Sequence, residues 1–175
     1  MILIVEGANR TGKSTMIGML QKLAENSGVE FMLYNSRINN NEHVGTTTEG
    51  MYAYAKSVIS DLLKEDTNEK LIVFDRFHIS ELVYGEAFRG YTNEYMLKID
   101  GFLDLMDAKI MYMKSNFEHV TDRHKALEYE ALQNRFDKAF VEYFNCKNVK
   151  AATFDGASEC EREEVAEEVM KWLLS

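Results

Sequence analysis

The sequence has no proline and only two cysteines among its 175 residues. Cys146 and Cys160 lack the spacing of a metal site, and one pair is too few for a disulfide framework, so we expect free thiols in a reducing cytoplasm. No apolar run approaches the ~20 residues that a membrane-spanning helix needs. The first residues, Met1–Glu6, lack the basic segment of a signal peptide. We therefore expect a cytoplasmic protein with no membrane partner.

Basic residues are also scarce. Twenty Lys and Arg stand against 29 Asp and Glu, which gives a formal net charge of −9. Nucleic-acid backbones repel a chain with this charge, so we expect no nucleic-acid partner. A small anionic substrate remains compatible with it, because a few cations gathered in one cleft suffice to bind such a molecule. Since 46% of the residues are hydrophobic, residues 1–175 can form one domain with a substantial core.

Short apolar runs alternate with longer amphipathic stretches along the whole chain. Five runs are typical of strands in a covered sheet: residues 2–5, 31–34, 71–74, 109–113 and 149–154. Segments of helical periodicity separate them, and one begins near a candidate capping box at Thr46 and Glu49. The alternation predicts a three-layer α/β/α domain with a mostly parallel sheet of about five strands. Ligands bind such sheets where the strands end, so the polar ends after Val5, Tyr34 and Phe74 should gather around one cleft.

A complete phosphate-binding motif, G-x-x-x-x-G-K-[ST], follows the first strand at Gly7–Ser14. Its two glycines let successive N–H groups point at phosphate oxygens, and the next helix adds its positive end. Lys13 is expected to reach the β- and γ-phosphates, and the Ser14 hydroxyl to ligate Mg²⁺. The motif therefore predicts a P-loop NTPase fold that binds ATP with Mg²⁺. The predicted ATP-binding residues of the loop are Gly7, Ala8, Asn9, Arg10, Thr11, Gly12, Lys13, Ser14 and Thr15.

Two further positions favour group transfer over binding alone. Arg10 inside the loop can neutralise charge on a phosphoryl group in transfer, unless it only faces solvent at the loop tip. Asp75, at the end of an apolar strand, can hold Mg²⁺ or orient an acceptor oxygen. Arg76 can bind an acceptor phosphate, and Ser80 and Tyr84 follow it on the same helix face. A purely structural pair that caps the helix is the alternative for Asp75 and Arg76.

These motifs resemble those of the thymidylate kinase family. Residues 6–15, EGANRTGKST, resemble the family's E-G-x-D-R-x-G-K-S-T loop, and residues 75–80, DRFHIS, resemble its D-R-[YF]-x-x-S element. The resemblance implies an ATP-dependent nucleoside monophosphate kinase of nucleotide biosynthesis that works with Mg²⁺. It implies that Arg10, Lys13 and Asp75 are catalytic and that Ser14 and Asp75 are metal ligands.

The resemblance also implies an acceptor site. The family's middle helix carries an aromatic side chain that stacks on the acceptor base, with an arginine one turn later, and Tyr52 and Lys56 fall at those places. Arg37 lies near the turn after the second strand, where the family has a proline, and is expected to face the acceptor phosphate. Asn9 stands where the family usually has an acid that contacts the acceptor sugar. The expected acceptor-binding residues are Asn9, Arg37, Tyr52, Lys56, Arg76, Ser80 and Tyr84.

On the donor side, residues 154–158 resemble the family's loop near adenine, which implies that Asp155 binds ATP. A short lid at about 114–128 carries Arg123, which the resemblance implies for ATP as well. The basic residues there motivate the expectation that this segment closes over ATP and excludes water.

The resulting prediction is a kinase that moves the γ-phosphoryl group of ATP to a deoxynucleoside monophosphate, with dTMP or dUMP favoured. One alternative is a deoxynucleoside kinase that phosphorylates a 5′-hydroxyl, with Asp75 as general base. Another is a non-kinase P-loop ATPase or nucleotide switch, although the chain has no N-K-x-D base motif. The sequence leaves monomer and homodimer open. The stripe of Phe136, Phe140 and Phe144 belongs either to the core or to a dimer face.

Overall fold

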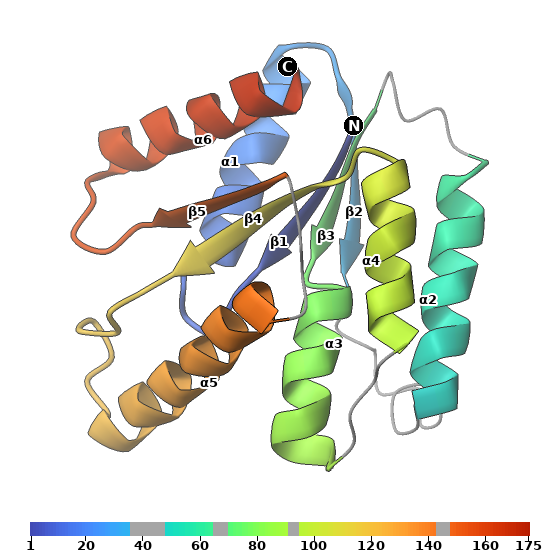
Figure 1. Ribbon diagram of the computed structural model, residues 1–175. Coiled ribbons are helices and arrows are strands. Elements are labelled where there is room, and N and C mark those ends of the chain that lie inside the picture. The colour runs from blue at the N-terminus through green and yellow to red at the C-terminus, as the bar shows by residue number, and fades with distance from the viewer. Residues whose placement is uncertain (36–47, 65–69, 91–94, 143–147) are drawn as a thin grey trace.

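The computed structural model describes residues 1–35, 48–64, 70–90, 95–142 and 148–175. Its centre is a sheet of five strands in the order β2-β3-β1-β4-β5, and all four pairings between neighbours are parallel (Figure 1). The strands are β1 (Ile2–Glu6), β2 (Glu30–Asn35), β3 (Lys70–Asp75), β4 (Lys109–Lys114) and β5 (Val149–Thr153). The predicted parallel sheet of about five strands is confirmed.

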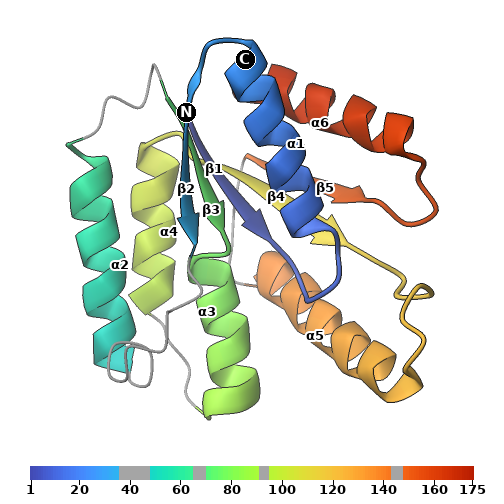
Figure 2. The same cartoon turned by 180° about the vertical axis from the view of Figure 1, so that it is seen from behind.

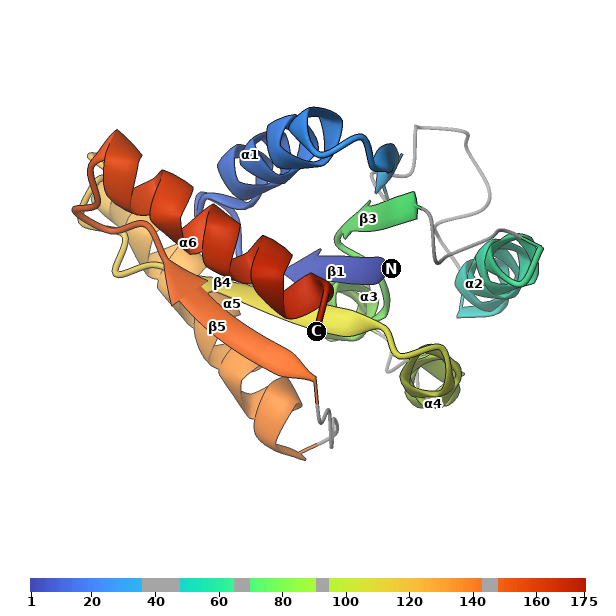
Figure 3. The ribbon, with the colours of Figure 1, turned by 90° about the horizontal axis from the view of Figure 1, so that it is seen from above.

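Helices cover both faces of this sheet. They are α1 (Lys13–Asn26), α2 (Thr48–Leu62), α3 (His78–Tyr84), α4 (Tyr95–Leu105), α5 (Arg123–Glu142) and α6 (Glu159–Leu173), with a π-helical turn η1 (Gly85–Arg89) after α3. Figures 2 and 3 show α1 and α6 on one face, and α2 to α5 on the other. The predicted three-layer architecture is therefore confirmed. Thr46, which the capping-box prediction needs, lies outside the described residues, and α2 begins at Thr48.

The central strand β1 explains how two cores form. Alternate side chains of β1 point to opposite faces of the sheet, and helices cover both faces, so all five of its residues are buried. Leu3 and Val5 enter a core with α1 and α6, whereas Ile2 and Ile4 enter a core with α2 to α5. A continuous apolar run thus anchors the strand that precedes the phosphate-binding motif.

The aromatic stripe of α5 belongs to the second core. Phe136 is fully buried, and Phe140 packs with its ring centroid 4.5 Å from that of Tyr112 in β4. Phe144 lies outside the described residues. The core reading of the stripe therefore holds for Phe136 and Phe140.

Strand register brings three chain segments to one edge of the sheet. Asp75 pairs in register with Val5 of β1 and with Asn35 of β2. The carboxyl ends of β1, β2 and β3 consequently lie level with one another, and the loop after β1 starts beside Asp75. In the part of the chain that the structure describes, no helix is both long and apolar enough to cross a membrane.

Candidate active site

The segment between β1 and α1 folds as a tight loop that only glycine permits at two points. Gly7 has φ 137° and Gly12 has φ 88°. A Cβ atom on Gly7 would lie 2.2 Å from the carbonyl oxygen of Met113 in β4, and one on Gly12 would lie 2.9 Å from the Phe154 ring. The loop is therefore pressed against β4 and against the end of β5. These close approaches give the two motif glycines their physical reason.

The motif lysine lies inside the loop. Lys13 as a residue is 7% exposed, and its ammonium donates hydrogen bonds to the carbonyl oxygen of Ala8 and, at 3.2 Å, to the hydroxyl of Thr11. The Thr11 hydroxyl in turn donates to the same Ala8 carbonyl at 3.1 Å. These contacts hold a cation within the ring of loop amides, which is the place that the motif assigns to phosphates.

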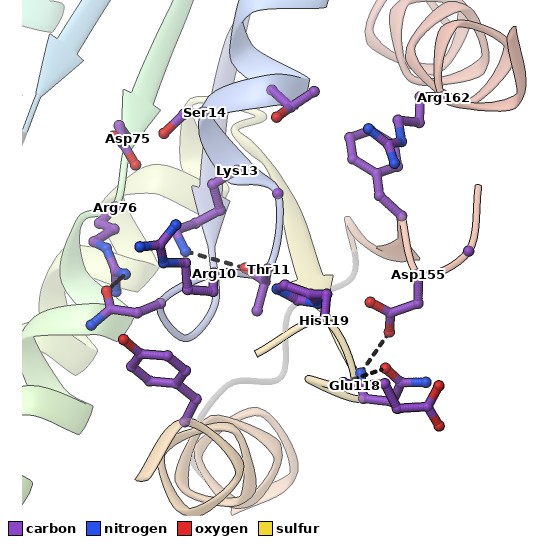
Figure 4. Close-up of a pocket in the computed structure, with 17 residues that line it drawn as sticks. Arg10, Thr11, Lys13, Ser14, Asp75, Arg76, Glu118, His119, Asp155 and Arg162 are labelled. Atoms are coloured by element: carbon purple, nitrogen blue, oxygen red, sulfur yellow. Dashed lines mark hydrogen bonds between the residues drawn. The ribbon is translucent and has the colours of Figure 1, made fainter. Parts of the chain in front are cut away.

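A cleft of about 1070 Å³ runs along the loop. It exceeds the range of roughly 300–1,000 Å³ that is usual for a pocket with one small ligand. Its lining comes from the loop, the ends of β3 and β5, the segment after β4, and helices α5 and α6 (Figure 4). The lining residues are Asn9, Arg10, Thr11, Gly12, Lys13, Ser14, Thr15, Asp75, Arg76, Asn116, Glu118, His119, Tyr129, Phe154, Asp155, Gly156 and Arg162.

Arg76 is fixed in one orientation at one end of the cleft. Its backbone has φ 70°, and its Nη2 donates to Oδ1 of Asn9 at 2.7 Å. Its Nη1 donates to the Tyr84 hydroxyl at 2.8 Å and to the Ser80 hydroxyl at 3.5 Å, and its Cζ lies 4.9 Å from the centroid of the Tyr84 ring. The structure thus brings together four residues that the sequence predicted for the acceptor.

The charge of Arg76 is not neutralised by these partners. Burial raises the pKa of Tyr84, so its phenol is neutral at pH 7. Asn9 is an uncharged amide at the position where the resemblance expects an acid. The third partner, Ser80, is a hydroxyl, so none of these three hydrogen bonds of Arg76 goes to a charged group, and its guanidinium suits an anionic ligand at the cleft.

Glu6 is a functional residue that sequence reasoning missed. Its side chain is fully buried at the end of β1 and accepts hydrogen bonds from the backbone N–H of Phe77 at 2.9 Å and of Ser80 at 3.2 Å, and from the Ser80 hydroxyl. These bonds fix the start of α3 to β1 and thereby position Arg76 beside the loop. The sequence signal was an acid at the end of a wholly apolar strand.

We expect Glu6→Gln to lower the free energy of unfolding by about 2 kcal/mol. Hydrogen bonds to a buried carboxylate are roughly twice as strong as neutral ones, and the amide NH₂ would replace the oxygen that now accepts from the Ser80 hydroxyl. Urea unfolding measures the change. Glu25→Gln, on the exposed side of α1, is the control and should leave the unfolding curve in place; an equal response of both variants would contradict this anchoring role.

On the donor side, Asp155 joins two segments. Its carboxylate accepts hydrogen bonds from the Ser115 hydroxyl at 2.8 Å and from the backbone N–H of Asn116 at 2.5 Å. Gln133 also holds Ser115. The Gln133 side chain accepts a hydrogen bond from the Ser115 N–H at 2.8 Å and donates one to the Ser115 carbonyl oxygen at 3.0 Å. Asp155 lines the cleft as predicted, but its hydrogen bonds position the chain after β4.

The segment predicted as a lid has no helix of its own. The loop after β4 ends at Asp122, and α5 runs without interruption from Arg123 to Glu142. Arg123 is exposed and does not line the cleft. Asn116, Glu118 and His119 line it instead, and the sequence analysis assigned none of them.

Of the predicted acceptor residues that the structure describes, Tyr52 and Lys56 are not brought to the cleft. Tyr52 is half-buried on α2 and stacks on Tyr95 of α4, with 4.7 Å between ring centroids. The Lys56 ammonium lies 5.6 Å from the centroid of the Tyr52 ring, and neither side chain lines the cleft. Arg37 lies outside the described residues. These assignments remain predictions.

The chemistry of the cleft fits Mg²⁺. Ser14 and Asp75 both line it, and their side chains offer the oxygen ligands that this ion prefers. Among the described residues, no group of three His, Cys, Asp or Glu side chains could hold a metal ion by itself. Mg²⁺ in phosphoryl-transfer sites is usually bound by one or two protein oxygens and by substrate phosphates, so two side chains are sufficient.

No protein-family model and no curated protein sequence matches the chain. Two solved structures resemble it over nearly its whole length. The YorR protein from Bacillus subtilis, in complex with phosphorylated GDP, has a TM-score of 0.70 and 17% identity, over 99% of this chain and 95% of that one. A thymidylate kinase from Candida albicans has a TM-score of 0.61 and 15% identity, over 97% of this chain and 90% of that one. With the phosphate loop in its expected place, the chain therefore has the fold of the thymidylate kinase-like P-loop kinases.

Proposed function

We propose that this chain is an ATP-dependent kinase that transfers the γ-phosphoryl group to a nucleoside monophosphate, with dTMP or dUMP as the expected acceptor. One observation carries the proposal: a complete phosphate loop and an arginine held by uncharged hydrogen-bond partners line the same cleft. An ATPase needs only the loop. A second cation fixed beside the loop is what transfer to a phosphorylated acceptor requires.

The donor is bound by the loop in this proposal. Its backbone amides and the Lys13 ammonium hold the β- and γ-phosphates, and Ser14 and Asp75 are the side chains that would hold Mg²⁺. The ion, when bound, neutralises charge on the phosphate oxygens. Because Lys13 is held by Ala8 and Thr11, little reorganisation is needed to place its charge.

Arg10 stabilises the group in transfer. It lines the cleft together with Lys13 and Arg76, and its side chain is exposed to the cleft and not buried in the loop (Figure 4). Phosphoryl transfer depends on positioning and charge neutralisation more than on covalent chemistry. Asp75 serves to orient the acceptor oxygen or the metal, and no enzyme nucleophile is required.

The acceptor phosphate is bound by Arg76, and the charge of Arg76 favours a monophosphate over a nucleoside. A nucleoside would place no anion against this guanidinium. Tyr52, Lys56 and Arg37 are proposed to hold the acceptor base and phosphate.

Guanine nucleotides are a second candidate acceptor class, because the similar YorR structure is described in complex with phosphorylated GDP. All ribo- and deoxynucleoside monophosphates, and the matching nucleosides, should therefore be tested with ATP and Mg²⁺ by following ADP release and identifying the product. We expect turnover of monophosphates. Activity on nucleosides alone would replace the proposal with a nucleoside kinase, and ATP hydrolysis that no acceptor stimulates would replace it with an ATPase.

A further inference from the structure

Arg162 is a cation of the cleft that the proposed mechanism does not use. It lies near the N-terminus of α6, lines the cleft, and has its Cζ 5.8 Å from the centroid of the Phe154 ring. Figure 4 shows it across the loop from Arg76, at the other end of the site. Its position calls for an explanation, since a helix N-terminus disfavours a positive charge.

The fold makes little use of this charge. The Nε atom of Arg162 is buried and has no hydrogen-bond partner among the described residues, an arrangement that costs free energy. Acidic residues flank it in the sequence, yet none of them forms an ion pair with it in the part of the chain that the structure describes. Glu161, which directly precedes Arg162, caps the helix with Ser158 instead.

Its place relative to the loop identifies the part of a ligand that it would meet. Phe154 packs against Gly12 of the phosphate loop, so Arg162 stands just beyond the loop, on the side away from Arg76. A donor whose terminal phosphate faces Arg76 must extend its nucleoside in the opposite direction. That direction leads past Phe154 to Arg162.

We infer that the planar guanidinium of Arg162 binds the base of the donor nucleotide by stacking on its face. This inference rests on the donor site of the proposed function. Arginine planes stack on aromatic rings, and the contact with Phe154 orients the plane in advance. The resemblance implied Arg123 as the arginine that binds ATP, but Arg123 does not line the cleft. Arg162 of α6 would supply that arginine instead.

The test is nucleotide binding by calorimetry with the full chain and Mg²⁺, without acceptor. The probes are adenosine 5′-(β,γ-imido)triphosphate, which has the base, and tripolyphosphate, which lacks it. Arg162→Met keeps an apolar stem on Phe154 but removes the planar cation. We expect it to weaken the nucleotide about three- to tenfold and to leave tripolyphosphate unchanged.

Lys171→Met is the matched control, because it removes the same charge from an exposed position of the same helix and should alter neither affinity. Arg162→Lys keeps the charge without the planar fork, and an intermediate loss for the nucleotide supports stacking even where the methionine variant folds poorly. An equal loss for both probes would assign Arg162 to the phosphates and overturn the inference, as would no loss for either. The binding test contains no acceptor, so its result does not depend on kinase activity. If the chain binds nucleotide through Arg162 but phosphorylates no compound of the acceptor panel, the kinase proposal fails and the inference about Arg162 stands.

Discussion

Arg10→Ala is expected to lower kcat by a factor of about 10² or more, with little change in KM for ATP. In the proposed mechanism the loop amides and Lys13 hold ground-state ATP, and the contacts of Lys13 with Ala8 and Thr11 do not involve Arg10. Removing a preorganised group that acts on the charge of the transition state costs roughly 10²–10³ in rate, and arginine fingers reach more. Steady-state kinetics with ATP, Mg²⁺ and the best acceptor from the monophosphate panel measure both constants.

The alanine variant gives a clean comparison. Arg10 has φ 65°, and both arginine and alanine carry a Cβ atom, so the backbone strain at this position is the same in the two proteins. Lys22→Ala, which removes an equal charge from the exposed side of α1, should keep full activity. A change confined to KM would show that Arg10 only binds ground-state ATP and would contradict its role in transfer.

The fold and the phosphate loop follow from local features of the sequence. The five apolar runs predict strands because each is short and continuous, and the motif at Gly7–Ser14 carries its own backbone requirements. Asp75 could be placed at a strand end from the sequence, and beside the loop only if the two strands are neighbours, which the pairing of β1 with β3 establishes. The order of the strands could not be derived in this way, because it depends on how the helices pack across the sheet and not on any one segment.

Residues with long-range partners escaped prediction for the same reason. Glu6 acts on Phe77 and Ser80, more than 70 positions away, so nothing in its own neighbourhood reveals the contact. Arg162 lies in an acidic stretch whose sequence is typical of a solvent-exposed helix face. Its place beside the cleft depends on Phe154, which packs against Gly12 of the loop and contacts Arg162, and this contact is not visible in the sequence.

The acceptor helix shows the limit of helical spacing. Tyr52 and Lys56 share a face of α2, as their spacing of four residues predicts, and the Lys56 ammonium lies over the Tyr52 ring. Spacing does not say which way that face is turned. The packing of α2 beside α4 decides it and stacks Tyr52 on Tyr95.

Gly7→Ala should lower the free energy of unfolding and abolish phosphate binding by the loop. The new Cβ would have to occupy φ 137° and would lie 2.2 Å from the Met113 carbonyl oxygen, a backbone atom that cannot rotate away. Backbone strain of this kind costs about 1–3 kcal/mol, and the clash adds to it, so we expect a loss of about 3 kcal/mol or more. For a chain of this length that corresponds to a fall in Tm of about 6–12 °C. Thermal and urea unfolding measure it, and calorimetry with tripolyphosphate reports the loop itself.

Gly18→Ala supplies the matched control for this substitution. Gly18 lies inside α1, and a Cβ there would meet no atom within 4 Å. Alanine is the better helix former by about 1 kcal/mol, so the same chemical change is expected to stabilise the protein at position 18 and destabilise it at position 7. Opposite signs would show that the cost at Gly7 comes from its backbone conformation and its contact with β4, and not from adding a methyl group as such. If Gly7→Ala has the same Tm as the wild type and still binds tripolyphosphate, the loop does not pack against β4 as described. The geometry proposed for the phosphate site would then be wrong.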